Sequence, residues 1–342
     1  MSQPKEKAKN DTGNVAENAP ANAGAIRIDL EEVLAQRLPK FRKFIPGWLI
    51  RWACRTIRQD GLNRIAAESA GLRGAEFCRG VLKSLKINFE AENTDLLPPP
   101  ENRRVLYVSN HPLGGLDGMA LIQFIQQRHG GKVFFVVNDL LMAVKPLEDV
   151  FLPINKAGKQ HREAAEAIQE AFAGNDPIIM FPAGLVSRLQ KVDRNEAGPL
   201  LNVALSNIAP ESGKQQGDGC KKERKVEVIA DLKWQKMFVN KAYQSRRDVI
   251  PLFFSGHNSL HFYKMARRRQ RLGLKFNYEQ IYLPGELFNL TGATLRAYFG
   301  SPVAWQKLTP GKGAEACAAR MRELVYSLAP APSEGVPPAG SV

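Results

Sequence analysis

The sequence predicts an α/β fold in which a mostly parallel sheet is covered by helices. Short apolar runs of β type alternate with longer segments whose apolar residues recur every three or four positions, a pattern typical of parallel strands joined by helices. Glycine-rich turns follow several of the apolar runs, as expected at the carboxyl edge of such a sheet. At 342 residues the chain can hold one large domain with extensions or two small domains.

Two polar tails flank the predicted folded part. Residues 1–28 are rich in Ala, Asn and Lys, and residues 329–342 in Pro, Gly, Ala and Ser, so both are predicted to be disordered. Residues 29–100 are predicted to be helical, with a possible membrane-interface segment, and end at three consecutive prolines. The α/β domain is predicted to follow, over residues 101–328.

Within this domain, strands are predicted where apolar residues run together and helices where they repeat at helical spacing. The predicted strands are residues 105–109, 133–137, 151–154, 178–181, 225–230 and 249–254. The predicted helices are residues 119–127, 160–173 and 314–328. This order places the turns after residues 109 and 181 at the same edge of the sheet.

Charge and cysteine usage narrow the classes of function. The chain has 48 Lys and Arg against 34 Asp and Glu, and a net charge of +14 attracts polyanions such as nucleic acid, an anionic membrane or an acidic carrier protein. Its four cysteines form no CxxC pair, which disfavours zinc sites and disulfides and suggests a reducing compartment. No apolar run approaches the ~18–20 residues that span a bilayer. Nucleic acid is not an expected partner, because the aromatic residues do not form an RNA-binding motif.

The most informative turn contains one histidine and one carboxylate. His111 and Asp117 flank Gly114 and Gly115, between the strand at 105–109 and the next helix. A histidine can act as a general base, and a carboxylate can fix its tautomer and stabilise the imidazolium. The glycines allow a tight turn and expose amides near a helix N-terminus. In the purely structural alternative, Asp117 only caps the helix.

A second turn contains a glycine, a serine and a cation. Gly184, Ser187 and Arg188 follow the strand at 178–181, and Lys156 follows the preceding predicted strand. Arginine offers a bidentate fork and lysine a point charge to a phosphate or carboxylate. Taken singly, an isolated lysine such as Lys156 is more often merely solvated, Arg188 can be solvated too, and Ser187 is more readily interpreted as a surface serine. Their ordered positions after strands favour anion binding.

Together these motifs resemble those of the glycerolipid acyltransferase family, which includes the lysophosphatidic acid acyltransferases. His111 and Asp117 resemble its His-x4-Asp motif, with five intervening residues instead of four. The second turn resembles its Phe-Pro-Glu-Gly-Thr-Arg-Ser block, with Ala183 in place of the glutamate and the arginine two places further on. Residues 151–156 and 249–254 resemble two further blocks, and all four occur in the family's order.

The resemblance implies an acyltransferase that moves a fatty acyl chain from a thioester of acyl carrier protein or coenzyme A to a hydroxyl of a lyso-lipid. His111 is then the general base and Asp117 orients it. The implied substrate-binding residues are Gly114, Gly115, Lys156, Gly184, Ser187 and Arg188. No metal or other cofactor is expected.

The replacement at Ala183 bears on the acceptor, because the family associates that glutamate with acceptor binding. The change favours an acceptor such as an N-acylated amino acid whose 3-hydroxyacyl chain awaits O-acylation. A 1-acylglycerol-3-phosphate acyltransferase stays open as an alternative.

Two basic segments suggest contact with a membrane. Residues 38–58 interleave aromatic and cationic side chains, as in an interfacial helix or, equally, a helix packed on the domain. The basic run at 262–271 can meet anionic lipid or an acidic carrier, or be a solvated helix face. The expected location is the cytoplasm, peripherally bound to the inner face of the membrane. A non-catalytic membrane-binding protein that retains only the fold is the second hypothesis.

Overall fold

The computed structural model describes residues 29–32, 45–154, 160–205, 225–274 and 277–331. Its helices are α3 (Gly47–Thr56), α4 (Gln59–Glu68), α5 (Gly74–Ser84), α6 (Gly115–His129), α7 (Gln160–Ala173), α9 (Met237–Ser245), α10 (Leu260–Arg271), α11 (Leu283–Asn289) and α12 (Ala314–Ser327). Its strands are β1 (Asn88–Glu92), β2 (Val105–Ser109), β3 (Phe134–Asn138), β4 (Phe151–Ile154), β5 (Ile178–Met180), β6 (Arg188–Asp193), β7 (Lys225–Ala230), β8 (Asp248–Phe254) and β9 (Thr294–Phe299).

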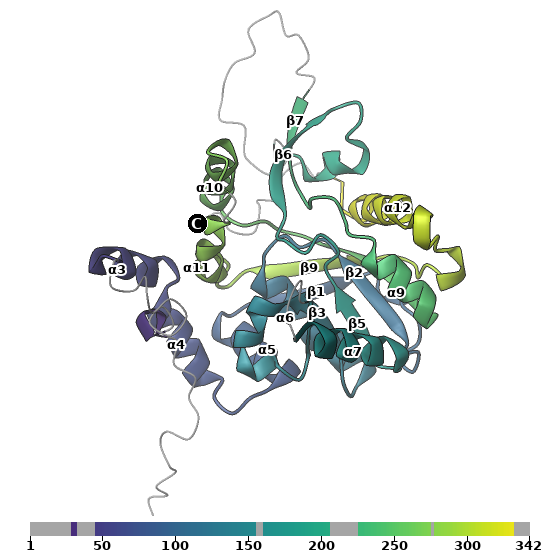
Figure 1. Ribbon diagram of the computed structural model, residues 1–342, viewed down its shortest axis with the longest axis horizontal. Coiled ribbons are helices and arrows are strands. Elements are labelled where there is room, and N and C mark those ends of the chain that lie inside the picture. Colours follow the sequence, from purple (N-terminus) through teal and green to yellow (C-terminus); the bar gives the residue numbers. More distant parts are fainter. Residues whose placement is uncertain (1–28, 33–44, 155–159, 206–224, 275–276, 332–342) are drawn as a thin grey trace, which may run out of the picture.

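Seven strands form one sheet, in the order β1-β9-β8-β2-β5-β3-β4, with helices around it (Figure 1). Five of the neighbouring pairs are parallel, and the pair of β8 with β9 is antiparallel. The predicted α/β class with a mostly parallel sheet is therefore confirmed. Strands β6 and β7 form a separate antiparallel pair, which rises above the sheet in Figure 1.

The central strand β2 is buried on both faces. Val105 and Tyr107 belong to the core that includes α5 and α6, whereas Leu106 and Val108 belong to the core that includes α7, α9 and α12. All four side chains are fully buried, which explains why the strand reads as a continuous apolar run. The rigid frame around β2 holds the start of the His111 turn.

The sequence pattern does not predict strands β1, β6 and β9. β1 pairs with β9 from Asn88 opposite Thr294 to Glu92 opposite Tyr298, so the sheet begins before residue 101, the predicted start of the domain. β1 lies at the edge of the sheet and has no buried residue, so it lacks an apolar run. Residues 225–230 do form a strand, but they pair with β6 outside the main sheet.

Helices α3 and α4 lie on one flank of the domain (Figure 1). No helix among the described residues is long and apolar enough to cross a membrane. The predicted tail at residues 1–28, the first part of the basic aromatic segment and residues 332–342 lie outside the described residues.

The C-terminal end of α6 contains a buried histidine. His129 Nδ1 lies 2.7 Å from the carbonyl oxygen of Pro100 and must donate to it, so Nε2 accepts from the Tyr107 hydroxyl at 2.8 Å. Burial lowers the pKa of His129. The hydrogen bond to Pro100 opposes this shift, and the positive charges of Arg128 and Arg103 add to it. The neutral imidazole is therefore the form that the fold requires.

We expect acidification through the ordinary histidine range to reduce folding stability. Because the pKa of His129 is lower in the folded state, the unfolded chain binds the proton first. The stabilising contribution is complete above the unfolded pKa of about 6.5 and is lost as the pH falls from there toward the folded pKa. Urea unfolding between pH 5 and 8 should show a smaller acid loss of stability in His129→Gln than in the wild type. Equal pH dependence in both proteins would contradict this.

Candidate active site

The loop after β2 is attached to β8 by Asn110. The Asn110 carboxamide accepts the Phe254 N–H at 2.6 Å and donates to the Phe254 carbonyl oxygen at 2.9 Å. Asn110 is buried, and a buried amide needs such partners. Its side chain thus continues the pairing of β2 with β8 beyond the strand and sets the direction in which the chain leaves the sheet.

His111 and Asp117 form a hydrogen-bonded pair. Nδ1 of His111 lies 3.0 Å from Oδ2 of Asp117, whose side chain is fully buried. The carboxylate also accepts the N–H groups of Leu113 at 2.9 Å and Gly118 at 2.8 Å. Because an ionised carboxylate only accepts, Nδ1 carries the proton and Nε2 presents a lone pair. Nε2 makes no hydrogen bond to any described residue. It is also not one of the fully buried polar atoms that lack a partner, so it is not enclosed by the protein.

The five-residue spacing does not separate the pair. Gly114, at φ +88°, precedes the first residue of α6, and Asp117 lies in the first turn of that helix. A positive φ of this size suits glycine and strains other residues. The turn therefore accommodates the additional residue while the ring and carboxylate remain in contact. Asp117 both binds helix-terminal amides and orients His111, so the structural and functional interpretations of this residue are compatible.

The backbone of the His111 turn is held by three other loops. The His111 N–H donates to Asp231 Oδ1 at 3.1 Å, and the His111 carbonyl oxygen accepts the Ser187 N–H at 2.7 Å. The next carbonyl, that of Pro112, accepts Nδ2 of Asn258 at 3.0 Å. The imidazole also stacks on the ring of Phe181, with 4.1 Å between ring centroids and 22° between planes. Neighbouring contacts on backbone and ring therefore restrict how far the base can move.

Asp231 is the site residue that sequence reasoning missed. It is fully buried and accepts the Ser187 hydroxyl at 2.6 Å and the Trp234 indole N–H at 2.9 Å, in addition to the His111 amide. Burial raises the pKa of Asp231, and these three hydrogen bonds oppose the rise. One local signal existed, because Asp231 directly follows a predicted strand, as the His111 turn does.

The predicted substrate-binding residues separate into two groups. Gly114 and Gly115 lie at the N-terminal end of α6, where a helix provides no internal acceptors for its first amides. Gly184, at φ +66°, has its amide bonded to the Phe181 carbonyl. The Ser187 hydroxyl is engaged by Asp231. Among these described residues, Gly184 and Ser187 therefore already have partners within the protein, whereas Gly114 and Gly115 belong to a helix terminus.

The sequence predicts that Arg188 binds a phosphate or carboxylate of the substrate, but its side chain contacts other residues of the protein. Its side chain is buried, pairs with the fully buried Glu279 at 3.1 Å and lies over the ring of Phe262 at 5.3 Å. Burial lowers the pKa of Arg188, while Glu279 opposes that change. Glu279 also pairs with Arg269 at 2.9 Å, so two guanidinium groups share this buried carboxylate. Lys156 lies outside the described residues.

The chain matches the profile of a protein family described as Acyltransferase over residues 32–195 and 217–328. The chain belongs to this acyltransferase family. Two relatives of the acyltransferase are lyso-glycine lipid O-acyltransferases, from Bacteroides thetaiotaomicron and Phocaeicola vulgatus. Each is 34% identical to it over 301 residues, which cover 88% of this chain and 97% and 95% of those proteins.

A solved structure, the 1-acyl-sn-glycerophosphate acyltransferase PlsC from Thermotoga maritima, matches 87% of this chain and 96% of its own, at 12% identity and a TM-score of 0.38. The predicted family and the predicted enzyme class are confirmed by the family profile and the relatives. The roles of individual site residues remain predictions that rest on the geometry above.

We expect Asp231→Asn to lower kcat about 10- to 100-fold while the acyltransferase stays folded, because a small misplacement of a catalytic group is enough to cause such a loss. The amide oxygen can still accept a hydrogen bond, but the buried negative charge beside the His111 turn is removed. Steady-state kinetics at saturating donor and acceptor, with thermal unfolding alongside, measure the effect.

Asp248→Asn is the matched control, since Asp248 accepts a single backbone amide, from Trp305, at the opposite end of β8. It should leave kcat unchanged. A folded Asp231→Asn protein with wild-type kcat would refute the positioning role.

Proposed function

We propose that this acyltransferase moves a fatty acyl chain from a thioester to the hydroxyl of a lyso-glycine lipid at a membrane surface. The observation that carries the proposal is the His111–Asp117 pair, in which Nδ1 is bound and Nε2 has no hydrogen-bond partner in the described part of the chain. The identity of two relatives as lyso-glycine lipid O-acyltransferases supports the choice of acceptor. A glycine-containing lipid also agrees with the absence of the acceptor-binding carboxylate at Ala183.

In the proposed reaction, Nε2 of His111 takes the proton of the acceptor hydroxyl as its oxygen attacks the thioester carbonyl carbon. The carbon–sulfur bond then breaks, and the imidazolium returns the proton to the departing thiolate, which leaves an ester and a free thiol. Asp117 stabilises the imidazolium between these steps. General base catalysis of this kind contributes about 10²- to 10⁴-fold.

The amides of Gly114 and Gly115 are proposed to stabilise the oxyanion of the tetrahedral intermediate. One such donor is often worth about 10²-fold or more. We propose direct transfer without an acyl-enzyme. Burial raises the pKa of the Cys78 thiol to about 12, so this thiol is not an activated nucleophile.

We expect His111→Ala to lower kcat about 10²- to 10⁴-fold without loss of folding, because the variant removes the base while the backbone contacts of the turn remain. Acylation of a lyso-glycine lipid and of lysophosphatidic acid, assayed in parallel, measures this and compares the two acceptors. Binding to liposomes should survive the substitution. Undiminished transfer by the variant would exclude His111 as the base, and exclusive use of lysophosphatidic acid by the wild type would refute the proposed acceptor.

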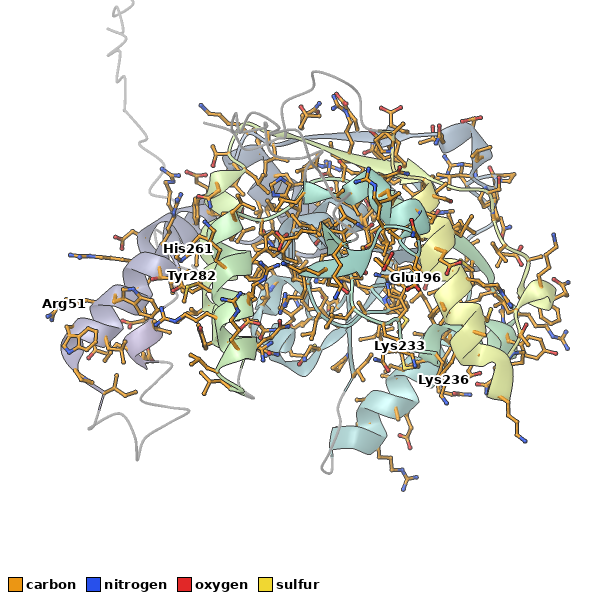
Figure 2. The ribbon with its side chains drawn as sticks, turned by 90° about the horizontal axis from the view of Figure 1, so that it is seen from above. Arg51, Glu196, Lys233, Lys236, His261 and Tyr282 are labelled. Carbon is orange, nitrogen blue, oxygen red and sulfur yellow. The ribbon has the colours of Figure 1, made fainter. Side chains whose placement is uncertain are left out.

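The membrane contact is assigned to α3. Trp48 is 64% exposed and Trp52 41% exposed, next to Leu49 and the exposed cations Arg51 and Arg55. Indole rings beside cations suit the headgroup region of a bilayer. Figure 2 shows Arg51 on the same flank as His261 and Tyr282, and Tyr282 contacts the Trp52 ring at 6.1 Å between centroids. The contact ties α3 to the rest of the domain.

We propose that the enzyme works in the cytoplasm, on the inner face of a membrane, with acyl carrier protein or coenzyme A as the acyl carrier. The net charge of +14 supports attraction to an anionic surface. The acyl chain of the acceptor can then remain in the bilayer while its head group enters the protein.

We expect the double substitution Trp48→Ser with Leu49→Ser to weaken binding to anionic vesicles about tenfold or more, because each large apolar side chain buried in the interface contributes roughly 1.5–3 kcal/mol. Vesicle sedimentation measures binding. Leu324→Ser is the control, because Leu324 is also exposed but lies on α12. Unchanged binding of the double variant would contradict the assignment of α3.

A further inference from the structure

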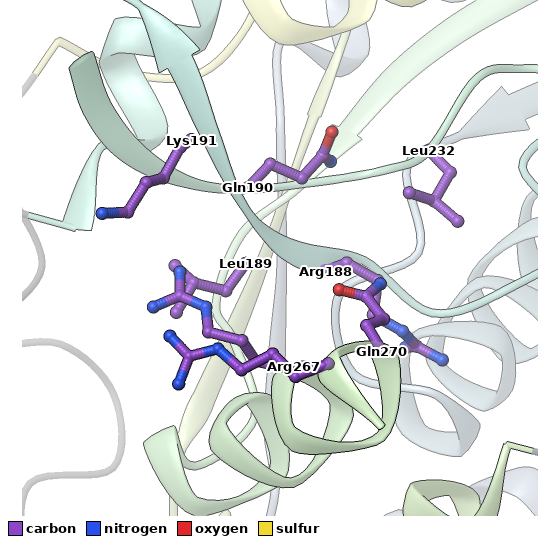
Figure 3. Close-up of a pocket in the computed structure, with 8 residues that line it drawn as sticks. Arg188, Leu189, Gln190, Lys191, Leu232, Arg267 and Gln270 are labelled. Carbon is purple, nitrogen blue, oxygen red and sulfur yellow. The ribbon is translucent and has the colours of Figure 1, made fainter. Parts of the chain in front are cut away.

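A cleft of about 540 Å³, lined by both polar and apolar side chains, lies between β6 and α10 (Figure 3). Its lining includes Gln190, Lys191, Leu232, Arg267, Gln270 and Arg271. Apart from the membrane or carrier contact predicted for the whole basic run at 262–271, none of these six side chains has a function assigned above. They therefore form a candidate site separate from the residues assigned to catalysis.

The cleft carries more positive than negative charge. Lys191 and Arg267 share a single carboxylate, that of Glu227, at 3.7 Å and 2.9 Å. Arg271 is exposed and makes no ion pair with any described residue. Arg188 also reaches the lining, and it shares the single carboxylate of Glu279 with Arg269, at 3.1 Å and 2.9 Å. The surplus favours an anionic ligand, and guanidinium groups with carboxamides suit the oxygens of a carboxylate.

The cleft is connected to the His111 turn through β6. Gln190 Nε2 donates to the carbonyl oxygens of Ala230 at 2.7 Å and Asp231 at 3.1 Å. Three residues earlier, the Ser187 N–H binds the His111 carbonyl. A strand advances about 3.3 Å per residue, so roughly 10 Å of backbone separate the catalytic turn from the cleft. A small substrate head group can span a gap of this size.

Apolar side chains accompany the cations. Leu189 and Leu232 line the cleft, and Leu272 and Leu274, just beyond Arg271, are 61% and 47% exposed. The His261 ring at the N-terminal end of α10 contacts Tyr282, which in turn contacts Trp52 of α3. The helix that lines the cleft thus reaches the flank proposed to meet the membrane. An anionic group attached to an apolar chain fits this setting.

We propose that the cleft binds the carboxylate of the acceptor lipid. The inference rests on the proposed function, because it assumes an N-(3-hydroxyacyl) amino acid as the acceptor. In an extended N-(3-hydroxyacyl)glycine, the carboxylate carbon lies roughly 7 Å from the hydroxyl oxygen. The trans amide separates its two flanking carbons by about 3.8 Å, and about three single bonds add the rest. Side chains of the cleft and His111 cover the remaining distance.

The test uses a soluble, short-chain N-(3-hydroxyacyl)glycine and the corresponding glycinamide, so that membrane binding does not enter. The variant is Lys191→Gln with Arg271→Gln, two exposed positions that leave the Arg267–Glu227 pair in place. We expect the KM for the glycine acceptor to rise about tenfold or more with little change in kcat, as for loss of uniform binding. The KM for the glycinamide should be the same in variant and wild type.

A matched control removes the same charge from the same helix outside the cleft. Lys264→Gln with Arg268→Gln changes two exposed cations of α10 and should leave the acceptor KM unchanged. An unchanged glycine KM in the cleft variant overturns the proposal, as does a rise confined to the KM of the acyl donor, which would assign the cleft to the donor's phosphate. Failure of the wild type to acylate either acceptor overturns the proposed function, and this inference with it.

Discussion

The position of the candidate base depends on hydrogen bonds to its own backbone. The N–H and carbonyl of His111 and the carbonyl of Pro112 are bound by Asp231, Ser187 and Asn258, which come from three different loops. These loops follow β5 and β8, which flank β2 in the main sheet, and β7 of the separate pair, so the turn is bound by segments from both sheets. Catalytic groups must be held within fractions of an ångström, and a turn anchored from several sides meets that demand.

Two buried carboxylates act on this one histidine in different ways. Asp117 binds Nδ1 and fixes the tautomer, whereas Asp231 binds the main-chain N–H and fixes the turn. Both are fully buried, so their negative charge is little screened by water. In the proposed mechanism each carboxylate would favour the imidazolium that forms during proton transfer. The same two residues therefore contribute to both the geometry and the electrostatics of the site.

The cations near the site lie in two places. Arg188, whose block resembles the family's Phe-Pro-Glu-Gly-Thr-Arg-Ser motif with Ala183 in place of the glutamate, shares buried Glu279 with Arg269. Cations with surplus charge lie further along β6 and on α10, around the cleft. The cleft that they surround is separated from the His111 turn by about three residues of β6. An acceptor whose charge lies several bonds from the reacting hydroxyl would suit this separation better than one with a phosphate next to the hydroxyl.

Local patterns in the sequence by themselves determined the class of fold, the buried strand β2, the helices α7 and α12 and the pairing of His111 with Asp117. Each depends on residues close together in the chain: an apolar run, a helical repeat, or a glycine turn followed by a helix. Tertiary structure alone decided that edge strand β1 joins β9, that Asp231 and Asn258 meet the catalytic turn from 120 and 146 residues away, and that Arg188 is held by Glu279. Those contacts form only when folding brings distant segments together. They could not be predicted from the sequence, because a hydrogen bond or ion pair between distant segments leaves no periodic signal in either segment.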